Sequence, residues 1–414
     1  RLWPRTEVGA GARVDCTLVQ SPVWSGQTLR KGGMLGRLGT DLFPENALRA
    51  GTAFAGVVSG QGPLVVGADP GAAAELLKQA LVCGVMAAGR SVLDIETTAS
   101  PVTEYTVSRL RAAGGIHVRA AGEQARVVFY DKGGRPVHRD LQRKLEKACA
   151  SQDFRRASAD GAGTIERCPE AEWLYLEHLA AQVNVAAVRA AGFRVQVEGP
   201  AVWPVLRRWL ERLHCRSAGG GPQLRLYLDP LESSWRLSDA TPEAMLALEV
   251  WLSMRSAAAG GEEEVPIPVT APRSVEELLR QAGRRPVRVR QLDWRPGDPL
   301  LAIGRLLEWM AADHLTESDI LGSLPRVYTA ERTVTCPWEA KGRVMRRLLE
   351  EHADMPVDLV DGLRILQADG WALLLPDPDE PVYRVYTEAD DLARAEALAE
   401  QYMQRVQALQ GARA

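Results

Sequence analysis

The chain has 414 residues, of which 46% are hydrophobic and 25% are charged, so it is neither a disordered tail nor a fibre. Basic and acidic residues number 50 and 53, and the net charge of −3 argues against general binding to nucleic acid or to an anionic membrane surface. The length predicts two to four domains, at about 100–200 residues each. No run approaches about 18 apolar residues, so no transmembrane helix is predicted. The six scattered cysteines predict reduced thiols and a cytoplasmic protein.

Residues 1–27 have a regular spacing of valines that differs from the pattern of the rest of the chain. Val8, Val14 and Val19 recur at five- to six-residue steps, with glycines between them. This spacing is typical of one coil of a hexapeptide β-helix, and one coil cannot bury its own core because such repeats need roughly three coils to be stable. Either further coils precede Arg1, or this segment is an irregular extension.

Strands and helices alternate from about residue 63. The short apolar run 63–69 predicts a buried strand, and 71–89 predicts a helix because its large apolar side chains fall on one face. A strand over 91–96 and a helix over 103–114 follow, and two further strands lie within 115–131. Such alternation predicts right-handed crossovers and a mainly parallel sheet, so the fold class is α/β.

The later segments predict smaller units. Residues 137–190 are predicted to be largely helical, and the small, Gly-rich and charged segment 256–264 is predicted to be a linker. The last block is predicted to be α+β, with a hairpin over 362–377 and a long closing helix. The predicted division is a β-helix coil with a linker over 1–27, followed by units over 28–150, 151–262, 263–326 and 327–414.

Several stretches carry a family resemblance, among them GTDLFPENALRAGTAFA, PLVVGAD, GGIHVRAAGEQARVVFYDKGGRPV and DGLRILQADGWALLLPDPDEP. Together they resemble the α-D-phosphohexomutases, the family of phosphoglucomutase and phosphomannomutase. The resemblance covers about residues 28–414 and implies three α/β units, the second and third shortened, and a C-terminal α+β unit. With RLWPRTEVGAG at its start, the chain is most similar to the phosphomannomutase-like C-terminal region of bacterial bifunctional mannose-1-phosphate guanylyltransferases.

The family's phosphoserine loop reads Thr-Ala-Ser-His-Asn-Pro and follows a Gly-Gly strand. The matching residues here are Arg119, Ala120, Ala121, Gly122 and Glu123, and the serine position falls on Ala121. Alanine offers no oxygen that could accept a phosphoryl group, so the resemblance implies a vestigial loop. His117 or Glu123 could carry phosphate instead, but a strand residue and an exposed loop charge are the favoured interpretations.

The family's metal loop, Asp-Gly-Asp-x-Asp-Arg, supplies alternating carboxylates for Mg²⁺. Its best match is LDPLESSWRLSD, in which Asp229 remains while the other two carboxylate positions fall on Leu231 and Ser233. One carboxylate does not make an octahedral oxygen site, so the sequence predicts no metal and no Mg²⁺ cofactor, with Asp229 as a vestige.

The family's phosphate clamp in the last unit reads Arg-Pro-Ser-Gly-Thr-Glu-Pro. The corresponding residues here are Leu375, Pro376, Asp377, Pro378, Asp379, Glu380 and Pro381. Hydroxyl and guanidinium donors have become carboxylates, and a phosphate would meet like charge there. Pro376, Asp377, Asp379 and Glu380 are therefore predicted to form a vestigial clamp.

Two hypotheses follow from these losses. The first is a catalytically degenerate phosphomannomutase-like module of a mannose-1-phosphate guanylyltransferase-type protein, with a structural or ligand-sensing role and no catalytic residue. The alternative is an active phosphosugar mutase with a rewired site and Mg²⁺-dependent turnover. As partners, the resemblance implies a sugar phosphate or nucleotide sugar, an N-terminal nucleotidyltransferase domain of the same chain, and a second copy in a homo-oligomer, without nucleic acid or membrane.

Overall fold

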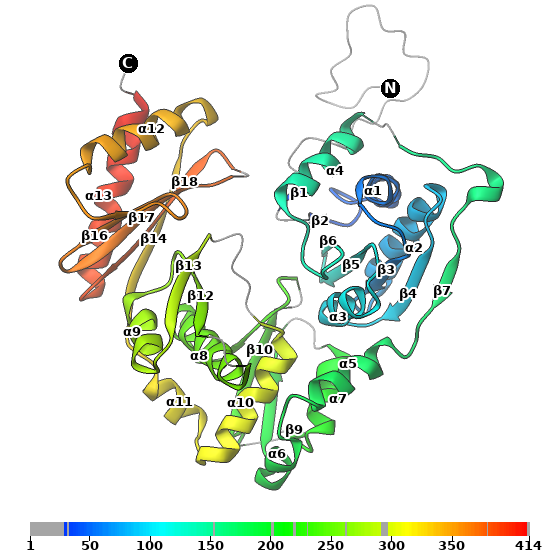
Figure 1. Ribbon diagram of the computed structural model, residues 1–414, viewed down its shortest axis with the longest axis horizontal. Helices are drawn as coiled ribbons and strands as arrows, with labels where there is room; N and C mark the ends of the chain where they lie inside the picture. Colours follow the sequence, from blue (N-terminus) through cyan, green and yellow to red (C-terminus); the bar gives the residue numbers. More distant parts are fainter. Residues whose placement is uncertain are drawn as a thin grey trace, which may run out of the picture. The chain divides into compact units, whose positions relative to one another are not determined.

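A computed structural model describes residues 29–30, 33–151, 154–199, 203–217, 221–229, 231–260, 263–290, 297–378 and 380–411 (Figure 1). The predicted β-helix coil over 1–27 lies outside these residues. The chain divides into two compact units. The first holds the chain up to Gly192 with Gln196–Ser217 and Leu226–Trp235, and the second holds Phe193–Val195, Ala218–Arg225 and the chain from Arg236 onward. This division does not test the predicted boundaries at residues 150, 262 and 326, which stay predictions.

A seven-stranded sheet organises the first unit, in the order β1-β2-β6-β5-β3-β4-β7. Its strands are β1 (Leu29–Arg30), β2 (Gly33–Arg37), β3 (Leu64–Ala68), β4 (Val92–Thr97), β5 (Gly114–Ala121), β6 (Gln124–Tyr130) and β7 (Ile165–Arg167). Strands β5, β3 and β4 are parallel, as the sequence predicts. Strand β7 also pairs parallel with β4, although it lies in the segment 137–190 that was predicted to be largely helical. The expectation of a mainly parallel sheet is wrong for β6, which returns antiparallel to β5, because a two-residue turn leaves no room for a crossover.

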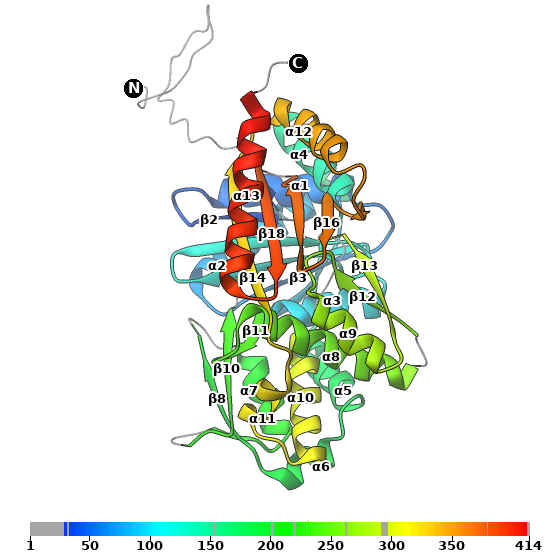
Figure 2. The ribbon, with the colours of Figure 1, turned by 90° about the vertical axis from the view of Figure 1, so that its left-hand side faces the viewer.

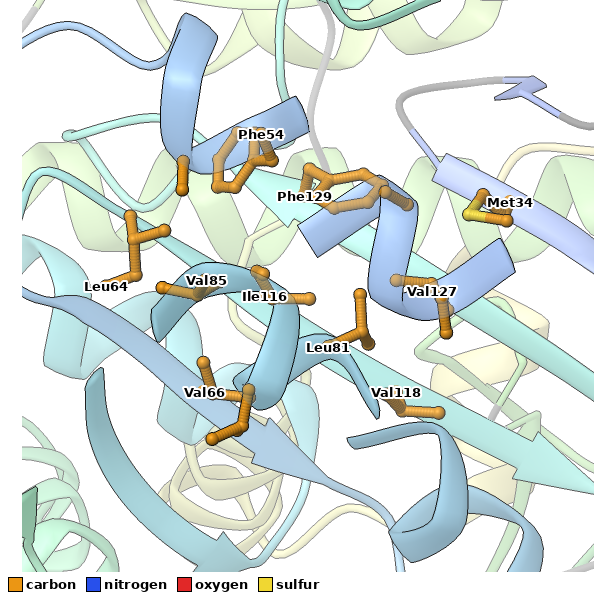
Figure 3. Close-up of a cluster of buried hydrophobic side chains, with 14 of the residues drawn as sticks. Met34, Phe54, Leu64, Val66, Leu81, Val85, Ile116, Val118, Val127 and Phe129 are labelled. Atoms are coloured by element: carbon orange, nitrogen blue, oxygen red, sulfur yellow. The ribbon is translucent and has the colours of Figure 1, made fainter. Parts of the chain in front are cut away.

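Helices cover both faces of this sheet. They are α1 (Pro44–Val57), α2 (Ala72–Ala87), α3 (Ser100–Leu110) and α4 (Arg139–Ser151). Leu64 and Val66 of β3 pack in the core that the sheet shares with α1 and α2, and Figure 3 shows Phe54 of α1 beside Phe129 of β6, with ring centroids 4.9 Å apart. The alternate strand positions, such as Gly67 of β3 and Gly115 of β5, face α3, because successive residues of a strand point to opposite faces of the sheet.

The middle of the chain alternates helices with short strands. A four-stranded sheet has the order β11-β10-β8-β9, and a separate parallel pair joins β12 to β13. The elements are α5 (Ala171–Ala180), α6 (Val185–Ala191), β8 (Arg194–Glu198), α7 (Pro204–Arg212), β9 (Arg216–Ser217), β10 (Leu224–Asp229), β11 (Ser234–Leu237), α8 (Pro242–Gly260), β12 (Glu264–Pro268), α9 (Arg273–Gln281), β13 (Arg285–Val289), α10 (Pro299–Asp313) and α11 (Glu317–Ser323). The linker predicted over 256–264 is wrong at its start, since α8 continues to Gly260 through an alanine run with high helix propensity.

An antiparallel five-stranded sheet forms the end of the chain, in the order β14-β18-β17-β16-β15. Its elements are β14 (Tyr328–Thr335), α12 (Trp338–Glu351), β15 (Val357–Asp358), β16 (Leu363–Gln367), β17 (Gly370–Pro376), β18 (Val382–Ala389) and α13 (Leu392–Gly411). Figure 2 shows α13 lying along β14 and β18. The hairpin predicted over 362–377 is confirmed as β16 and β17. Among the described residues, no helix combines the length and apolar character needed to cross a bilayer.

Candidate functional site

The predicted phosphoserine loop is a tight β-hairpin turn. Ala121, the last residue of β5, pairs with Gln124, the first residue of β6, so that Gly122 and Glu123 alone form the connection. Gly122 has a φ of +58°, a left-handed conformation that glycine adopts without strain. Glu123 is exposed at the tip. This turn contains no hydroxyl or thiol that could accept a phosphoryl group.

The predicted metal loop is the turn between β10 and β11, and it belongs to the same compact unit. The Asp229 Oδ1 atom accepts hydrogen bonds from the backbone N–H groups of Leu231, at 3.0 Å, and Glu232, at 3.2 Å. Asp229 therefore stabilises the turn that contains it, as aspartate commonly does. At the far side of the turn, Ser233 has a φ of +55°, and its hydroxyl lies 2.8 Å from the hydroxyl of Ser100.

Two buried guanidinium groups join the β5–β6 hairpin to the β10–β11 turn. Arg119 and Arg126 lie directly opposite each other on β5 and β6, an arrangement in which like charges repel. The Leu231 carbonyl oxygen accepts a hydrogen bond from Nη1 of each arginine, at 3.1 Å and 3.3 Å. Arg126 also forms a 2.7 Å ion pair with Glu232, and Arg119 donates to the Tyr130 hydroxyl at 3.1 Å. These partners compensate two like charges that would otherwise destabilise the hairpin.

The sequence analysis singled out Arg119 as part of the loop but missed Arg126. Once β5 and β6 are aligned as a hairpin with a two-residue turn, the alternation of the strands brings the two arginines opposite each other. The pairing of the two arginines could therefore have been predicted from the sequence. It required recognising a two-residue turn between β5 and β6, which the prediction of a parallel sheet did not allow.

This arrangement does not fit a divalent cation. Asp229 Oδ1 is already used by two backbone N–H groups, and the Leu231 carbonyl by two guanidiniums. A cation in the turn would also lie among two positive charges, and repulsion rises steeply at short range in a poorly solvated site. Among the residues that the structure describes, no group of three His, Cys, Asp or Glu side chains could hold a metal ion.

Titration of Mg²⁺ into the purified chain is expected to release no heat and to leave the melting temperature unchanged. The guanidiniums of Arg119 and Arg126 already supply positive charge to this turn, and they would repel an added cation. Isothermal titration calorimetry measures this, with Asp229→Ala as the comparison. Submillimolar Mg²⁺ binding that Asp229→Ala abolishes would contradict the expectation.

A buried polar cluster lies under β5. The two ring nitrogens of His117 contact the Thr103 hydroxyl, at 2.7 Å, and the Asp69 carboxylate, at 3.2 Å, and the other Asp69 oxygen accepts from the backbone N–H of Ala120, at 3.3 Å. His117 is fully buried. Both of its nitrogens are engaged and out of contact with solvent, so His117 is not an accessible phosphate carrier.

The burial of His117 is expected to make the folding stability of the protein decrease at acidic pH. Burial lowers the pKa of His117, an effect that Asp69 opposes and that the charges of Arg119 and Lys78 reinforce. In the unfolded chain, the His117 side chain takes up a proton at about pH 6.5. In the folded chain it takes up the proton only at lower pH, so the free energy of unfolding should fall as the pH drops below about 6.5. Urea unfolding between pH 7 and pH 5 should therefore show a smaller loss of stability for His117→Asn than for wild type. The exposed His138→Asn variant is the control, and equal losses in His117→Asn and wild type would exclude this account.

The predicted phosphate clamp connects β17 to β18. Asp377 Oδ2 accepts from Arg384 Nε at 2.9 Å, and Arg384 Nη2 lies 3.4 Å from Glu380 Oε2. Lys341 donates to the backbone carbonyls of both acidic residues. The carboxylates of Asp377 and Glu380 thus bind cations of the protein itself, Pro376 ends β17, and Asp379 lies outside the described residues. The turn has none of the hydroxyl donors of the family's clamp.

The first unit also has a cavity, of about 550 Å³, beside α2 and the carboxyl end of β4. Its lining includes Gly71 before α2, Lys78, Asp94 and Arg167. Lys78 is buried and contacts Asp94 at 3.1 Å. Open α/β sheets bind ligands beyond the carboxyl ends of their strands, so this cavity is a second part of the candidate site.

Residues 26–156 match the family model for phosphoglucomutase/phosphomannomutase, alpha/beta/alpha domain I. A "Probable phosphoglucosamine mutase" from Methanopyrus kandleri is 26% identical over 452 aligned positions, which cover 91% of this chain and 97% of that protein. The protein of the same name from Pyrococcus horikoshii is 24% identical, with 89% and 94% covered. Residues 26–156 thus resemble the first domain of phosphoglucomutases and phosphomannomutases, and the similarity to phosphoglucosamine mutases extends along most of the chain.

Solved structures support the phosphohexomutase fold. A phosphoglucomutase/phosphomannomutase family protein from Burkholderia thailandensis superposes with a TM-score of 0.76 at 17% identity, covering 94% of this chain and 99% of that one. The Paramecium phosphoglucomutase parafusin, in its open form, superposes with a TM-score of 0.68 at 11% identity, with 94% and 96% covered. The phosphohexomutase fold, mixed α/β with several sheets, is thus confirmed.

One expectation is overturned by these relatives. The chain was expected to be a degenerate phosphomannomutase-like module of a guanylyltransferase. That expectation is wrong, because the similarity runs along about nine tenths of both chains and the relatives are named as mutases. Nothing in these phosphohexomutase relatives supports the link to mannose-1-phosphate guanylyltransferases. The comparisons favour the alternative, a phosphosugar mutase.

Proposed function

We propose that this protein is a phosphosugar mutase that moves a phosphoryl group between hydroxyl oxygens of a hexosamine phosphate. The observation that carries the proposal is the similarity to phosphoglucosamine mutases along nearly the whole length of both chains. The name of these relatives supplies the substrate class, a glucosamine phosphate. A cytoplasmic location and a homo-oligomer are part of the same proposal.

The proposal requires a phosphate carrier other than residue 121. Catalysis of phosphoryl transfer consists mostly of positioning and charge neutralisation, and Arg119 and Arg126 offer fixed positive charge where the β5–β6 and β10–β11 turns meet. Ser233 is a half-buried hydroxyl in the second of these turns and has a left-handed backbone. Such strained residues cluster at functional sites, so Ser233 is our candidate carrier.

The transfer step balances without an added reactant. As the bond between phosphorus and the sugar oxygen breaks, a bond forms between phosphorus and Ser233 Oγ. The proton of the serine hydroxyl is released and the departing sugar oxygen takes one up. The reverse step, to the other hydroxyl of the sugar, completes the isomerisation. No step passes through a metal ion, since the turn does not fit one.

The test is a ³¹P NMR assay of the purified chain with glucosamine 6-phosphate and glucose 1,6-bisphosphate, with and without EDTA. Appearance of glucosamine 1-phosphate supports the proposal, and no turnover under any condition contradicts it. Intact-mass and phosphopeptide analysis then locate the carrier. Ser233→Ala should abolish both phosphorylation and turnover, whereas Ser234→Ala, at the exposed neighbouring serine, should retain them. Turnover that survives in Ser233→Ala would exclude Ser233 and leave the mutase activity standing.

A further inference from the structure

The second unit contains a cavity of about 330 Å³, remote in sequence from the turns of the candidate site. It is bounded by α9, β13, β15 and β16. The charged side chains in its lining are Arg273, Glu276, Glu277, Arg280, Arg288, Asp358 and Arg364. Four arginines against three carboxylates leave one positive charge in excess, which favours an anion.

Two of these arginines use their guanidinium groups in hydrogen bonds to backbone carbonyls. Arg288 donates to the backbone carbonyls of Pro268, Val269 and Ala271, at 2.8–3.3 Å. Arg273 donates to the carbonyls of the β16–β17 turn, at 2.6 and 2.7 Å. Neither guanidinium is therefore free to reorganise around a ligand.

Arg364 differs from both. It is only 5% exposed, yet its Nε atom has no hydrogen-bond partner among the residues that the structure describes. Oε1 of Glu276 lies 3.7 Å from Nη1 of Arg364, beyond hydrogen-bond range. The guanidinium carbon lies 4.3 Å from the ring centroid of Trp371, which fixes the group from one side.

A buried guanidinium with an unused donor is costly unless a partner fills the cavity. Burial, together with the neighbouring charge of Arg288, lowers the pKa of Arg364 to about 10, so the group still carries its charge at neutral pH. The planar fork of arginine matches two oxygens of a phosphate group, and stacking on an aromatic ring leaves the N–H edges of the fork available. Arg280 on α9 is largely exposed and pairs with Glu276 at 2.8 Å, and its guanidinium can supply a second cation at the rim of the cavity.

We propose that this cavity binds the phosphate group of a small molecule, with Arg364 as the buried anchor and Arg280 as an exposed second contact. The site stands apart from the proposed mutase function, because none of its residues takes part in the turns described above. Inorganic phosphate and a phosphate monoester present the same oxygens, so the test distinguishes them.

The test is calorimetric titration of the whole chain with inorganic phosphate and, separately, with glucosamine 6-phosphate, each against chloride at matched ionic strength. Phosphate should bind to wild type, and Arg364→Gln should weaken the affinity about 10- to 100-fold because two charge-assisted hydrogen bonds are lost. A monoester that binds more tightly than phosphate identifies a metabolite site, and equal affinities identify a phosphate-ion site.

Two further variants keep the test decisive if Arg364→Gln fails to fold. Arg364→Lys retains the charge but not the fork, and Arg280→Gln removes an exposed side chain; both should weaken binding by several fold. Arg347→Gln, which changes an exposed arginine paired with Glu350 on α12, should bind as wild type does. Absence of phosphate binding to wild type, or unchanged affinity in the Arg364 and Arg280 variants, would overturn the proposal.

Discussion

Gly84→Ala is expected to lower the free energy of unfolding by about 2–4 kcal/mol. Gly84 of α2 lies against α1 so closely that an added Cβ atom would overlap the backbone carbonyl oxygen of Leu48 and lie 2.9 Å from the backbone nitrogen of Thr52. Backbone atoms cannot move aside as a flexible side chain does, so the two helices must separate and open the core beneath them. Urea unfolding followed by circular dichroism measures the loss.

Gly56→Ala in α1 is the matched control. An added Cβ atom at Gly56 meets nothing within 4 Å. Alanine has the higher helix propensity, so this change should be neutral or stabilise the protein by about 0.5 kcal/mol. If both variants lost the same stability, close helix contact would not be the cause.

Arg119→Met is expected to lower stability by about 3 kcal/mol and to release the β10–β11 turn from the hairpin. The change removes the donor to the Leu231 carbonyl and to the Tyr130 hydroxyl, and it leaves the partly exposed Glu104 without the cation that lies 3.7 Å away. The fixed positive charge between the turns is halved. If the chain is a mutase, kcat/KM should therefore fall about 100-fold.

Hydrogen exchange distinguishes release of the turn from general unfolding. The backbone N–H groups of Leu231 and Glu232 should exchange faster in Arg119→Met, while those of β3 keep their protection. Arg135→Met, at an exposed arginine after β6, is the control and should leave both regions unchanged. Unaltered exchange in the turn of Arg119→Met would show that the guanidinium does not hold it.

Local patterns predicted the framework well. The apolar run at β3 and the one-sided helix at α2 were recognisable because burial imposes a period on each element. The hairpin of β16 and β17 was predicted from two apolar runs around a short polar turn. The antiparallel direction of β6 was missed, because strand direction depends on a turn of two residues and not on the strand itself.

The candidate site was harder to predict than the fold. Position 121 ends strand β5, and positions 231 and 233 lie in the turn between β10 and β11. The loss of their expected chemistry led to an inference of inactivity that the similarity to mutases along most of the chain contradicts. Whether the loss of an expected catalytic residue abolishes activity depends on which side chains lie near its position in the folded protein. Arg126 and Leu231 are 105 positions apart in sequence, and the contact between them follows from tertiary structure alone.

The arginine pair opposite the β10–β11 turn also constrains how this protein can evolve. Acidic residues introduced at positions 231 and 233 would join a turn whose Leu231 carbonyl already binds two guanidiniums, and these charges would compete with a divalent cation for the new carboxylates. Replacing either arginine first would strip the Leu231 carbonyl of one donor and weaken the attachment of the turn. A path toward a metal loop that begins at either arginine therefore begins with a loss of stability.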